Sequence, residues 1–170
     1  MNSYLVLTII GDDKPGLVEQ IAKAVADNSG NWLQSHMSQL AGKFAGILQV
    51  SVPDANAEQL IADLNKLSGS LKLVIERVKP DAASANLRTL VLNLVGNDRP
   101  GIIKEVSRVL ARAGVNVEDL ETECAPAPMS SDILFRANAL LKVASDADLD
   151  SLRKELERIA DDLIVEIQLA

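Results

Sequence analysis

Two near-identical six-residue stretches constrain the fold of this chain more than any other feature. GDDKPG occupies residues 11–16 and GNDRPG occupies residues 96–101, an offset of 85 positions (96 − 11). The offset continues through the following segment, where Leu17 corresponds to Ile102. A self-similar period near half the chain length indicates a duplicated unit. We therefore expect the 170 residues to form two similar small domains rather than one larger domain.

The ends of the two copies align at a larger offset. LKLVIERV at residues 71–78 matches LIVEIQLA at residues 163–170, a difference of 92 positions (163 − 71). The second copy therefore carries seven extra residues (92 − 85), which we place around PAPMSS at residues 126–131. On this alignment, CAPAPMSSD at residues 124–132 is an insertion between the middle strands, and it could cover a site, form a partner surface, or do neither.

A short polar segment separates the copies. KPDAASAN, residues 79–86, contains small residues and a proline, which is a linker composition. The sequence predicts a first domain at residues 1–79, a linker at 80–86 and a second domain at 87–170.

Each copy predicts the same order of elements. In the first copy, residues 3–10 form an apolar strand that ends at Gly11. Pro15 is expected at the first helical position, and Gly30 is expected to close the helix in a left-handed turn. The second copy repeats these signals at Pro100 and Gly114.

The remaining segments complete an α+β fold. Strands at 31–40 and 44–52 are joined by a hairpin at Ala41-Gly42-Lys43, followed by a helix at 56–69 and a closing strand at 71–78. The order β-α-β-β-α-β predicts a ferredoxin-like domain, an antiparallel sheet with both helices on one face. The chain would contain two of them.

Both faces of the first strand are apolar. Leu5, Leu7 and Ile9 alternate with Val6 and Ile10, and one layer of helices can cover a single face. Domains of this size are marginally stable alone, so we expect the modules to pair within the chain, between chains in a homodimer, or in both ways.

The composition excludes several functional classes. A net charge of −7 and four scattered aromatic residues argue against a nucleic-acid partner, which requires a basic face or a stacking platform. No apolar run is long enough to span a membrane, and the N-terminus lacks the features of a signal peptide. A single cysteine excludes an internal disulfide framework and favours a cytoplasmic location.

The repeated corner has the chemistry of a small zwitterion site. A helix start carries free N–H groups and the positive end of the dipole, which favour an anion. Gly16 and Gly101 allow a ligand close to the backbone, and Asp13 and Asp98 could accept hydrogen bonds from an ammonium group. The same residues also make ordinary turns, and a duplication copies turns as readily as sites.

The repeated unit resembles the ACT domain, a βαββαβ module that binds amino acids and regulates other proteins. The resemblance rests on DKPGLVEQIAKAVADNSGN and DRPGIIKEVSRVLARAGVNVEDL. Together with GNWLQSHMSQLAGKFAGILQV, the pair of modules is similar to the glycine cleavage system transcriptional repressor group. That resemblance implies regulation through a transcription activator protein, relieved by glycine, with glycine or serine as the ligand.

In that family the ligand lies between paired modules, against the strand-to-helix loop of one and the start of the second strand of the other. By position, the resemblance implies that the ligand-binding residues are Asp12, Asp13, Pro15, Gly16, Leu17, Asn31, Asn97, Asp98, Pro100, Gly101, Ile102 and Asn116. We expect no cofactor and no metal.

Three isolated residues do not change this interpretation. His36 has no identifiable nucleophile or orienting group, so a structural or interface role is favoured over catalysis. Cys124 and His36 together cannot supply a zinc ligand set, and nothing near Cys124 in sequence would lower its pKa. Trp32 is expected to pack in the core rather than wall a pocket.

Two other functional classes remain open. The chain could be an interaction module whose corners are only turns, and it would then bind its partner without any ligand. An enzyme on the same frame ranks last, because no pair of nucleophile and base can be placed. The sequence thus favours a regulatory, non-enzymatic protein.

Overall fold

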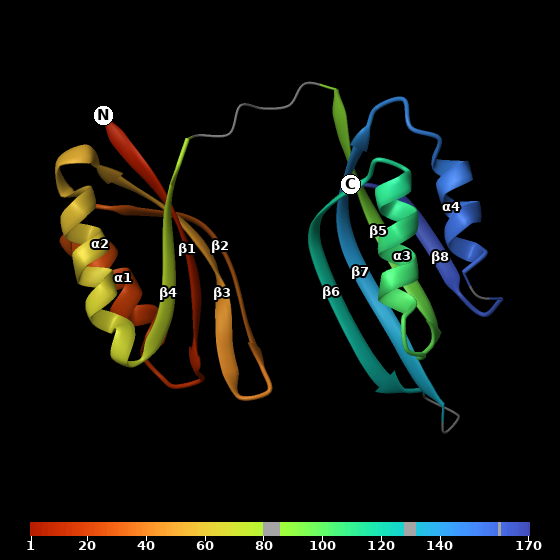
Figure 1. Ribbon diagram of the computed structural model, residues 1–170, viewed down its shortest axis with the longest axis horizontal. Coiled ribbons are helices and arrows are strands. Elements are labelled where there is room, and N and C mark those ends of the chain that lie inside the picture. The colour runs from red at the N-terminus through yellow and green to blue at the C-terminus, as the bar shows by residue number, and fades with distance from the viewer. Residues whose placement is uncertain (80–85, 128–131, 160) are drawn as a thin grey trace. The chain divides into compact units, whose positions relative to one another are not determined.

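The computed structural model describes residues 1–79, 86–127, 132–159 and 161–170. The chain divides into two compact units, Met1–Ala82 and Ala83–Ala170, each built from one four-stranded antiparallel sheet and two helices (Figure 1). Nearly all of the expected linker at 80–86 lies outside the described residues.

The first unit has the predicted order of elements, and its sheet has the strand order β2-β3-β1-β4. Short 3₁₀ turns flank the second helix. The bounds are β1 Asn2–Asp12, α1 Leu17–Asp27, β2 Asn31–Leu40, β3 Lys43–Pro53, α2 Ala57–Asn65 and β4 Leu71–Val78.

The second unit repeats this topology with the strand order β6-β7-β5-β8. Its elements are β5 Leu87–Asn97, α3 Ile102–Arg112, β6 Asn116–Pro126, β7 Ile133–Ala144, α4 Leu149–Glu157 and β8 Ile164–Leu169. In both units the helices lie on one face of the sheet (Figure 1). The prediction of two ferredoxin-like α+β domains is confirmed.

Each core forms where alternate residues of the central strand meet the apolar stripe of the helices. Residues that face the helices are almost wholly buried, and each large apolar side chain contributes about 1.5–3 kcal/mol to folding. In the first unit these include Leu5, Leu7, Ile9, Leu17, Ile21, Val25, Leu60 and Leu64; in the second they include Leu90, Leu92, Leu94, Ile102, Val106, Leu110, Leu152 and Leu156.

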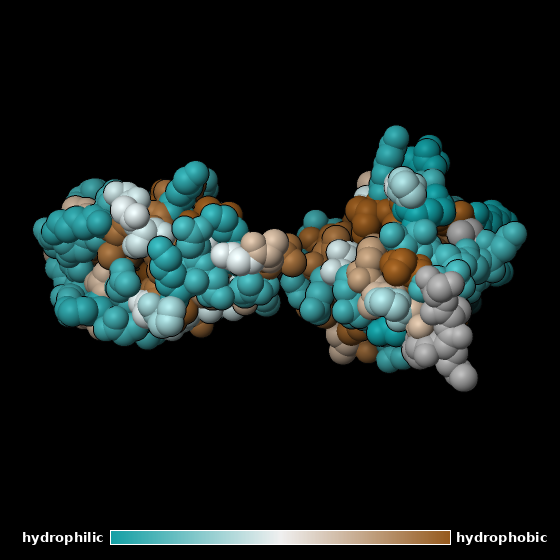
Figure 2. All heavy atoms as spheres, turned by 90° about the horizontal axis from the view of Figure 1, so that it is seen from below, coloured by the Kyte–Doolittle hydropathy of each residue, from teal (hydrophilic) through white to brown (hydrophobic). Residues whose placement is uncertain are grey.

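The opposite face of the first sheet keeps apolar side chains at its surface. Ile47 and Val74 both pair with Thr8, so these residues project to the same side of the sheet, and Ile10 projects with them. The side chains of Ile10, Ile47 and Val74 are all exposed. Hydrophobic residues, brown in Figure 2, reach the molecular surface among hydrophilic ones. As expected, the helices of the unit cover only one face of β1.

The strand registers locate the extra residues of the second copy. Gly11 pairs with Phe44, whereas Gly96 pairs with Phe135, an offset of 91 (135 − 44) in place of 85. Six extra residues therefore lie in the β6–β7 connection, and the seventh lies between β7 and α4. The expected insertion at 124–132 began too early, because β6 extends to Pro126. Within that connection, residues 128–131 lie outside the described residues.

Three local predictions at the repeated corner were wrong. The first strand does not end at Gly11 but continues through Asp12, because both residues still pair with β3. The helix begins at Leu17 rather than at Pro15, since Gly16 has a φ of 90° and forms the N-cap. Likewise, α3 begins at Ile102 and not at Pro100.

The end of the first helix also differs from the prediction. Ser29, with a φ of 58°, takes the left-handed conformation that we had assigned to Gly30. Gly30 is instead required by close packing, because a Cβ there would lie 2.9 Å from the backbone oxygen of Val25. Gly114 does adopt the expected left-handed conformation, with a φ of 67°.

Candidate functional site

The first corner is fixed to the β2–β3 hairpin. The Asp13 N–H donates a hydrogen bond of 3.0 Å to the Gly42 carbonyl, and Asp12 forms an ion pair with Lys43. The hydrogen bond and charge of Lys43, with a smaller effect of Lys14, hold the pKa of the Asp12 carboxyl below its ordinary value. Asp12 is therefore engaged in the structure of the corner, whereas the side chain of Asp13 is not.

No side chain caps the start of α1. Gly16 occupies the N-cap position and has no side chain to offer. Within the described part of the chain, the backbone N–H groups of Leu17, Val18 and Glu19 have no acceptor. Such N–H groups, with the positive end of the helix dipole, attract anions.

A hollow of about 510 Å³ lies beside this helix start. Asp13 and Lys14 line it on the corner side, Val18 and Glu19 on the helix side, and Phe44 on the strand side. Gly16 and Leu17 complete the lining. Neither the Asp13 nor the Lys14 side chain forms a hydrogen bond or ion pair with any other described residue. A carboxylate, an ammonium group and free N–H donors therefore line one open hollow.

The second corner has the same backbone but its charged groups are engaged. The Arg99 guanidinium pairs with both carboxylate oxygens of Glu105 and also donates to the Ile159 carbonyl. The hydrogen bond between them raises the pKa of Arg99 and lowers the pKa of Glu105. The Asn97 N–H donates at 2.8 Å to Asp162, and this bond lowers the pKa of the Asp162 carboxyl.

The start of α3 remains largely free at this corner. Gly101 has a φ of 91° and provides no cap, and the Ile102 N–H makes only a long contact of 3.5 Å with the Arg99 carbonyl. Asp98 donates its N–H to Ile133 at 2.8 Å. The two corners therefore share the helix start but differ in the charge available around it.

Asp98 lies beside the single cysteine. Loss of solvation, followed by the charge of Asp98 and a hydrogen bond to it, raises the pKa of the Cys124 thiol. Cys124 pairs with Phe135 late on β6, as Gln39 pairs with Phe44 late on β2, so the expected equivalence of Cys124 and Gln39 is confirmed. A raised pKa disfavours the thiolate and so disfavours nucleophilic chemistry here.

Each unit separates its corner from its candidate asparagine. Asn31 pairs with Ser51, which pairs with Tyr4 near the start of β1, whereas the corner follows the end of β1. Asn116 has the equivalent place, paired with Lys142, and both asparagines are exposed. The twelve predicted residues thus form two corner groups and two distant asparagines.

Trp32 and His36 lie where a structural role explains them, and no metal site forms among the described residues. The Trp32 indole packs against the first core and donates a hydrogen bond of 3.2 Å to Ser35. His36 is exposed on β2 and lines a surface hollow of about 180 Å³ with Val6 and Ile47. In the described residues, no three His, Cys, Asp or Glu side chains gather as metal ligands.

Sequence reasoning missed four residues at the corners. Lys43 and Phe44 reach the first corner because the hairpin register brings the start of β3 opposite Asp12 and Gly11. Glu105 and Asp162 reach the second corner from α3 and from the turn before β8. The hairpin signal could have found Lys43, but no sequence pattern indicates the approach of Asp162.

The comparison with known proteins decides the family. The family model described as the ACT domain matches residues 3–77 and again residues 88–170. The chain belongs to the ACT domain family. ACT domains are regulatory modules, and two of them account for nearly the whole sequence.

Curated relatives match about half of this chain. A UPF0237 protein from Methanocaldococcus jannaschii is 30% identical over 79 residues, which cover 46% of this chain and 81% of the relative. A UPF0237 protein from Methanopyrus kandleri is 33% identical over 77 residues, 45% of this chain and 80% of the relative. These relatives therefore match a length close to one ACT unit.

Two solved structures match the whole chain. A protein from Galdieria sulphuraria, described as unknown, superposes with a TM-score of 0.88 at 25% identity, covering 100% of this chain and 99% of the other. A candidate glycine cleavage system transcriptional repressor superposes with a TM-score of 0.70 at 18% identity, covering 100% and 98%. The second similarity shows that the two proteins share the same fold.

Among the described residues, no helix is both long enough and apolar enough to span a bilayer.

Proposed function

We propose that this ACT protein senses a small amino acid at the first corner and transmits its binding to a partner protein. The observation that supports this most directly is the uncapped start of α1 beside a hollow that contains the free side chains of Asp13 and Lys14. The four groups that a zwitterion requires, two donors and two charges, are thus available in one place.

Each part of a bound amino acid has a specific partner in this proposal. The ligand carboxylate accepts hydrogen bonds from the N–H groups of Leu17 and Val18, where the helix dipole also stabilises it. Its ammonium group donates to the Asp13 carboxylate, and Lys14 adds positive charge beside the ligand carboxylate. The absence of a side chain at Gly16 lets the ligand reach the backbone.

The second corner is the weaker site. Arg99 is bound to Glu105 and to the Ile159 carbonyl, and Asp162 adds a negative charge beside Asn97. A ligand carboxylate at Gly101 would therefore meet less free positive charge than at Gly16. We propose that binding is asymmetric, with the first corner occupied at lower ligand concentration.

Paired modules would complete the site. We propose that residues 1–79 and 87–170 act as separate domains joined by the linker 80–86. Asn31 and Asn116 would contact a ligand only if another module, from this chain or from a homodimer, brought them opposite a corner. The exposed apolar face with Ile10, Ile47 and Val74 supports such pairing.

Glycine or serine is the proposed ligand, and a transcription regulator of glycine and one-carbon metabolism in the cytoplasm is the proposed partner. The name of the similar solved structure supports this choice. The net charge of −7 favours contact with a protein over contact with DNA. The ligand would act by favouring one of two states of the chain that differ in affinity for the partner.

A calorimetric titration tests the amino-acid site. Glycine, serine and then the other free amino acids are titrated into the full chain and into Asp13→Asn, which keeps the shape of the side chain and removes its charge. We expect the variant to lose binding at least tenfold, about 1.4 kcal/mol. The matched variant Asp98→Asn should retain the first binding event, because it alters the weaker corner.

Two results would overturn the proposal. If no amino acid changes the thermal stability or gives binding heat, the alternative of a ligand-independent interaction module holds. If binding occurs with the same affinity in Asp13→Asn, the ligand lies elsewhere and the first corner is a turn only.

A further inference from the structure

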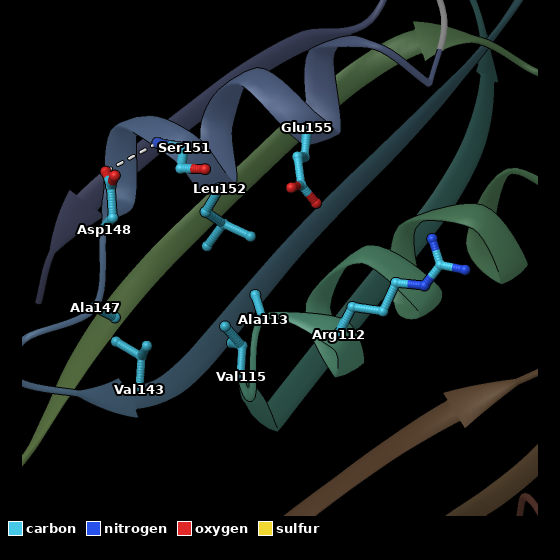
Figure 3. Close-up of a pocket in the computed structure, with 9 residues that line it drawn as sticks. All are labelled: Arg112, Ala113, Val115, Val143, Ala147, Asp148, Ser151, Leu152 and Glu155. Atoms are coloured by element: carbon cyan, nitrogen blue, oxygen red, sulfur yellow. Dashed lines mark hydrogen bonds between the residues drawn. The ribbon is translucent and has the colours of Figure 1, made fainter.

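The helix side of the second unit has a hollow, but the hollow exposes little apolar surface. It has a volume of about 390 Å³ and opens between α3 and α4 (Figure 3). Val115, Val143 and Leu152, which line it, are already buried against the core. At its edge the Asp148 carboxylate accepts the Ser151 N–H at 3.0 Å (Figure 3). This side of the unit therefore gives an apolar partner little to cover.

The face of the first sheet that is turned away from the helices does expose apolar side chains. Its central row crosses all four strands and consists of the paired residues His36, Ile47, Thr8 and Val74. Ile47 is 51% exposed and Val74 is 58% exposed. The neighbouring rows add the uncharged residues Ser38, Ala45, Ile10, Gln34, Gln49 and Val6. We call this surface the open face.

The equivalent face of the second unit carries charges in the same places. Its central row consists of the paired residues Glu121, Asn138, Asn93 and Glu166. Glu121 thus replaces His36, and Glu166 replaces Val74. Charged side chains are almost never buried unless they are paired, whereas an exposed apolar patch often marks an interface. The first unit therefore has the composition of a covered face, and the second unit has that of a solvated one.

Two opposite charges lie on β4 at equal distances from the central row. Lys72 pairs with Ile10 and Glu76 pairs with Val6, and each is two residues from Val74 along the strand. Because side chains alternate along a strand, all three of these β4 residues project to the open face. Neither Lys72 nor Glu76 forms an ion pair or hydrogen bond with another described residue. One strand therefore presents two unpaired charges symmetrically about Val74.

This symmetry distinguishes two ways in which a second copy could cover the open face. Sheets that pack face to face lie about 10 Å apart, with their strands within about 30° of each other. A two-fold axis along the strands would place Lys72 opposite Ser38 of the second copy and Glu76 opposite Gln34. An axis across the strands at Val74 places Lys72 opposite Glu76 instead. Burying a charge without a partner is costly, so the second arrangement is favoured.

We propose that the open face of the first unit is a homodimer interface, on which a second copy packs the same face about a two-fold axis that crosses the strands at Val74. Val74 then meets Val74 of the second copy, and two reciprocal ion pairs join Lys72 to Glu76. Both charges of β4 acquire partners, and the exposed apolar side chains leave water. The interface lies away from the corners and requires no ligand.

The other residues of the central row fit this symmetry. An isologous interface brings residues on its axis against their own copies, so it excludes strong charges there. Ile47, Thr8 and His36 include no carboxylate, lysine or arginine. In the second unit Glu121 and Glu166 would each meet an identical carboxylate. The proposal therefore assigns the dimer contact to the first unit.

The size of the open face fits a dimer of moderate affinity. Four strands about 4.8 Å apart, each eight residues long at about 3.3 Å per residue, cover about 500 Å² in each copy. The pair then buries about 1,000 Å², which is near the lower limit of specific interfaces. We therefore expect a dissociation constant in the micromolar range rather than an obligate dimer.

Sedimentation equilibrium of the full chain over a series of protein concentrations tests the proposal. We expect a reversible monomer–dimer equilibrium. Lys72→Glu places two carboxylates opposite each other and Glu76→Lys places two ammonium groups opposite each other, so each should weaken dimerisation at least tenfold. The double variant exchanges the two charges and should restore the dissociation constant to within about threefold of the original value.

Val74→Glu provides an independent variant, because it brings two carboxylates together at the axis and should abolish the dimer. Glu166→Lys, at the equivalent position of the second unit, should leave the dissociation constant unchanged. Asp13→Asn, which tests the amino-acid site, should also leave it unchanged, so the two proposals can fail separately. The substituted residues are all exposed, and cooperative thermal unfolding of each variant shows that the fold is retained.

Each of three outcomes would overturn the assignment. One is a full chain that stays monomeric at every concentration, because another protein would then have to cover the open face. Another is a dimer that Val74→Glu does not weaken, because the contact would lie elsewhere. The third is a double charge variant that dimerises no better than the single variants, because Lys72 and Glu76 would then not pair across the interface.

Discussion

The Asn28 side chain donates a hydrogen bond of 3.0 Å to Asp63, and this bond joins the end of α1 to α2. Asn28 also bonds to Ala24 and accepts a bond from Asn56, so one nearly buried residue connects three parts of the first unit. Ala113, which lies 85 positions further on at the equivalent place in the second unit, has no side-chain donor and cannot make these bonds. The duplicated units thus stabilise the ends of their helices differently.

Replacing Asn28 by alanine should destabilise the first unit. The substitution removes the side-chain donor to the Ala24 carbonyl and to Asp63, whereas the backbone carbonyl that accepts from Asn56 remains. Loss of a buried hydrogen-bonded polar group costs about 1–3 kcal/mol. Urea unfolding of the full chain, followed by Trp32 fluorescence, measures the effect on this unit. Asn65→Ala, an exposed substitution near the end of α2, is the control, and an equal effect of both would contradict the prediction.

The Asp63 carboxyl should make the first unit sensitive to acid. The hydrogen bonds from Asn28 and then from Lys66 lower its pKa from 3.8 to about 2. A lowered pKa in the folded state stabilises the protein above the unfolded pKa, and this stabilisation is lost as the pH falls from about 4 towards 2. NMR titration of the carboxyl group measures the pKa directly.

The same titration in Asn28→Ala provides the control for the acid prediction. Because Asn28 is the largest cause of the shift, the pKa of Asp63 should rise towards 3.8 in that variant. An unchanged pKa would show that Lys66 and Gln59, without Asn28, account for the lowered value.

The fold could be predicted from the sequence because its signals are local and repeated. The apolar run around Leu5 and Leu7, the helical spacing of Leu17 and Ile21, and the Ala41-Gly42 hairpin signal each depend on nearby residues. In the structure Ala41 and Gly42 have φ values of 50° and 76°, as the tight hairpin requires. Duplication provided the same evidence a second time.

The errors at the corner arise from interactions between distant residues. β1 continues past Gly11 because Asp12 still pairs with Lys43 of β3, and no local signal shows where pairing stops. The proline at position 15 indicated a helix start, but the left-handed Gly16 delays the first helical residue to Leu17. Both errors displaced boundaries without changing the order of elements.

The candidate sites were less accessible to sequence reasoning than the fold. The corner residues were identifiable because the repeat marks them, yet their charges differ through partners that lie far along the chain, such as Asp162. The hydrogen bond between Asn28 and Asp63 joins two helices that are far apart in the sequence, and no local pattern indicates it. The sequence shows that Asn28 of the first copy is replaced by Ala113 in the second. It does not show that Asn28 joins two helices through Asp63.

The repeated glycines at the end of the central strands should not be equally sensitive to substitution. A Cβ at position 11 would lie 2.6 Å from the Ser70 backbone oxygen, whereas a Cβ at position 96 would lie 3.0 Å from the Leu163 side chain. A backbone oxygen cannot move without displacing β4, but a leucine side chain can change its position. Gly11→Ala should therefore destabilise the chain by about 1–3 kcal/mol and Gly96→Ala by less.

Thermal and urea unfolding of both glycine variants test this difference. Gly69→Ala is the control, because a Cβ at that position meets no atom within 4 Å and the backbone is not left-handed. Equal destabilisation by Gly11→Ala and Gly96→Ala would show that β4 can shift as easily as the Leu163 side chain.

The Cys124 thiol should react slowly with alkylating reagents despite its exposure. Loss of solvation and the neighbouring Asp98 raise its pKa, so the reactive thiolate is less populated near neutral pH than in an ordinary cysteine. The rate of alkylation by iodoacetamide, measured against pH, gives the thiol pKa.

Asp98→Asn should lower that pKa and increase the rate at neutral pH, because it removes the negative charge beside the sulfur. Glu121→Gln removes a charge from the same strand that does not act on the thiol, and it should change neither the thiol pKa nor the alkylation rate. An unaltered pH profile in Asp98→Asn would show that Asp98 does not influence the thiol.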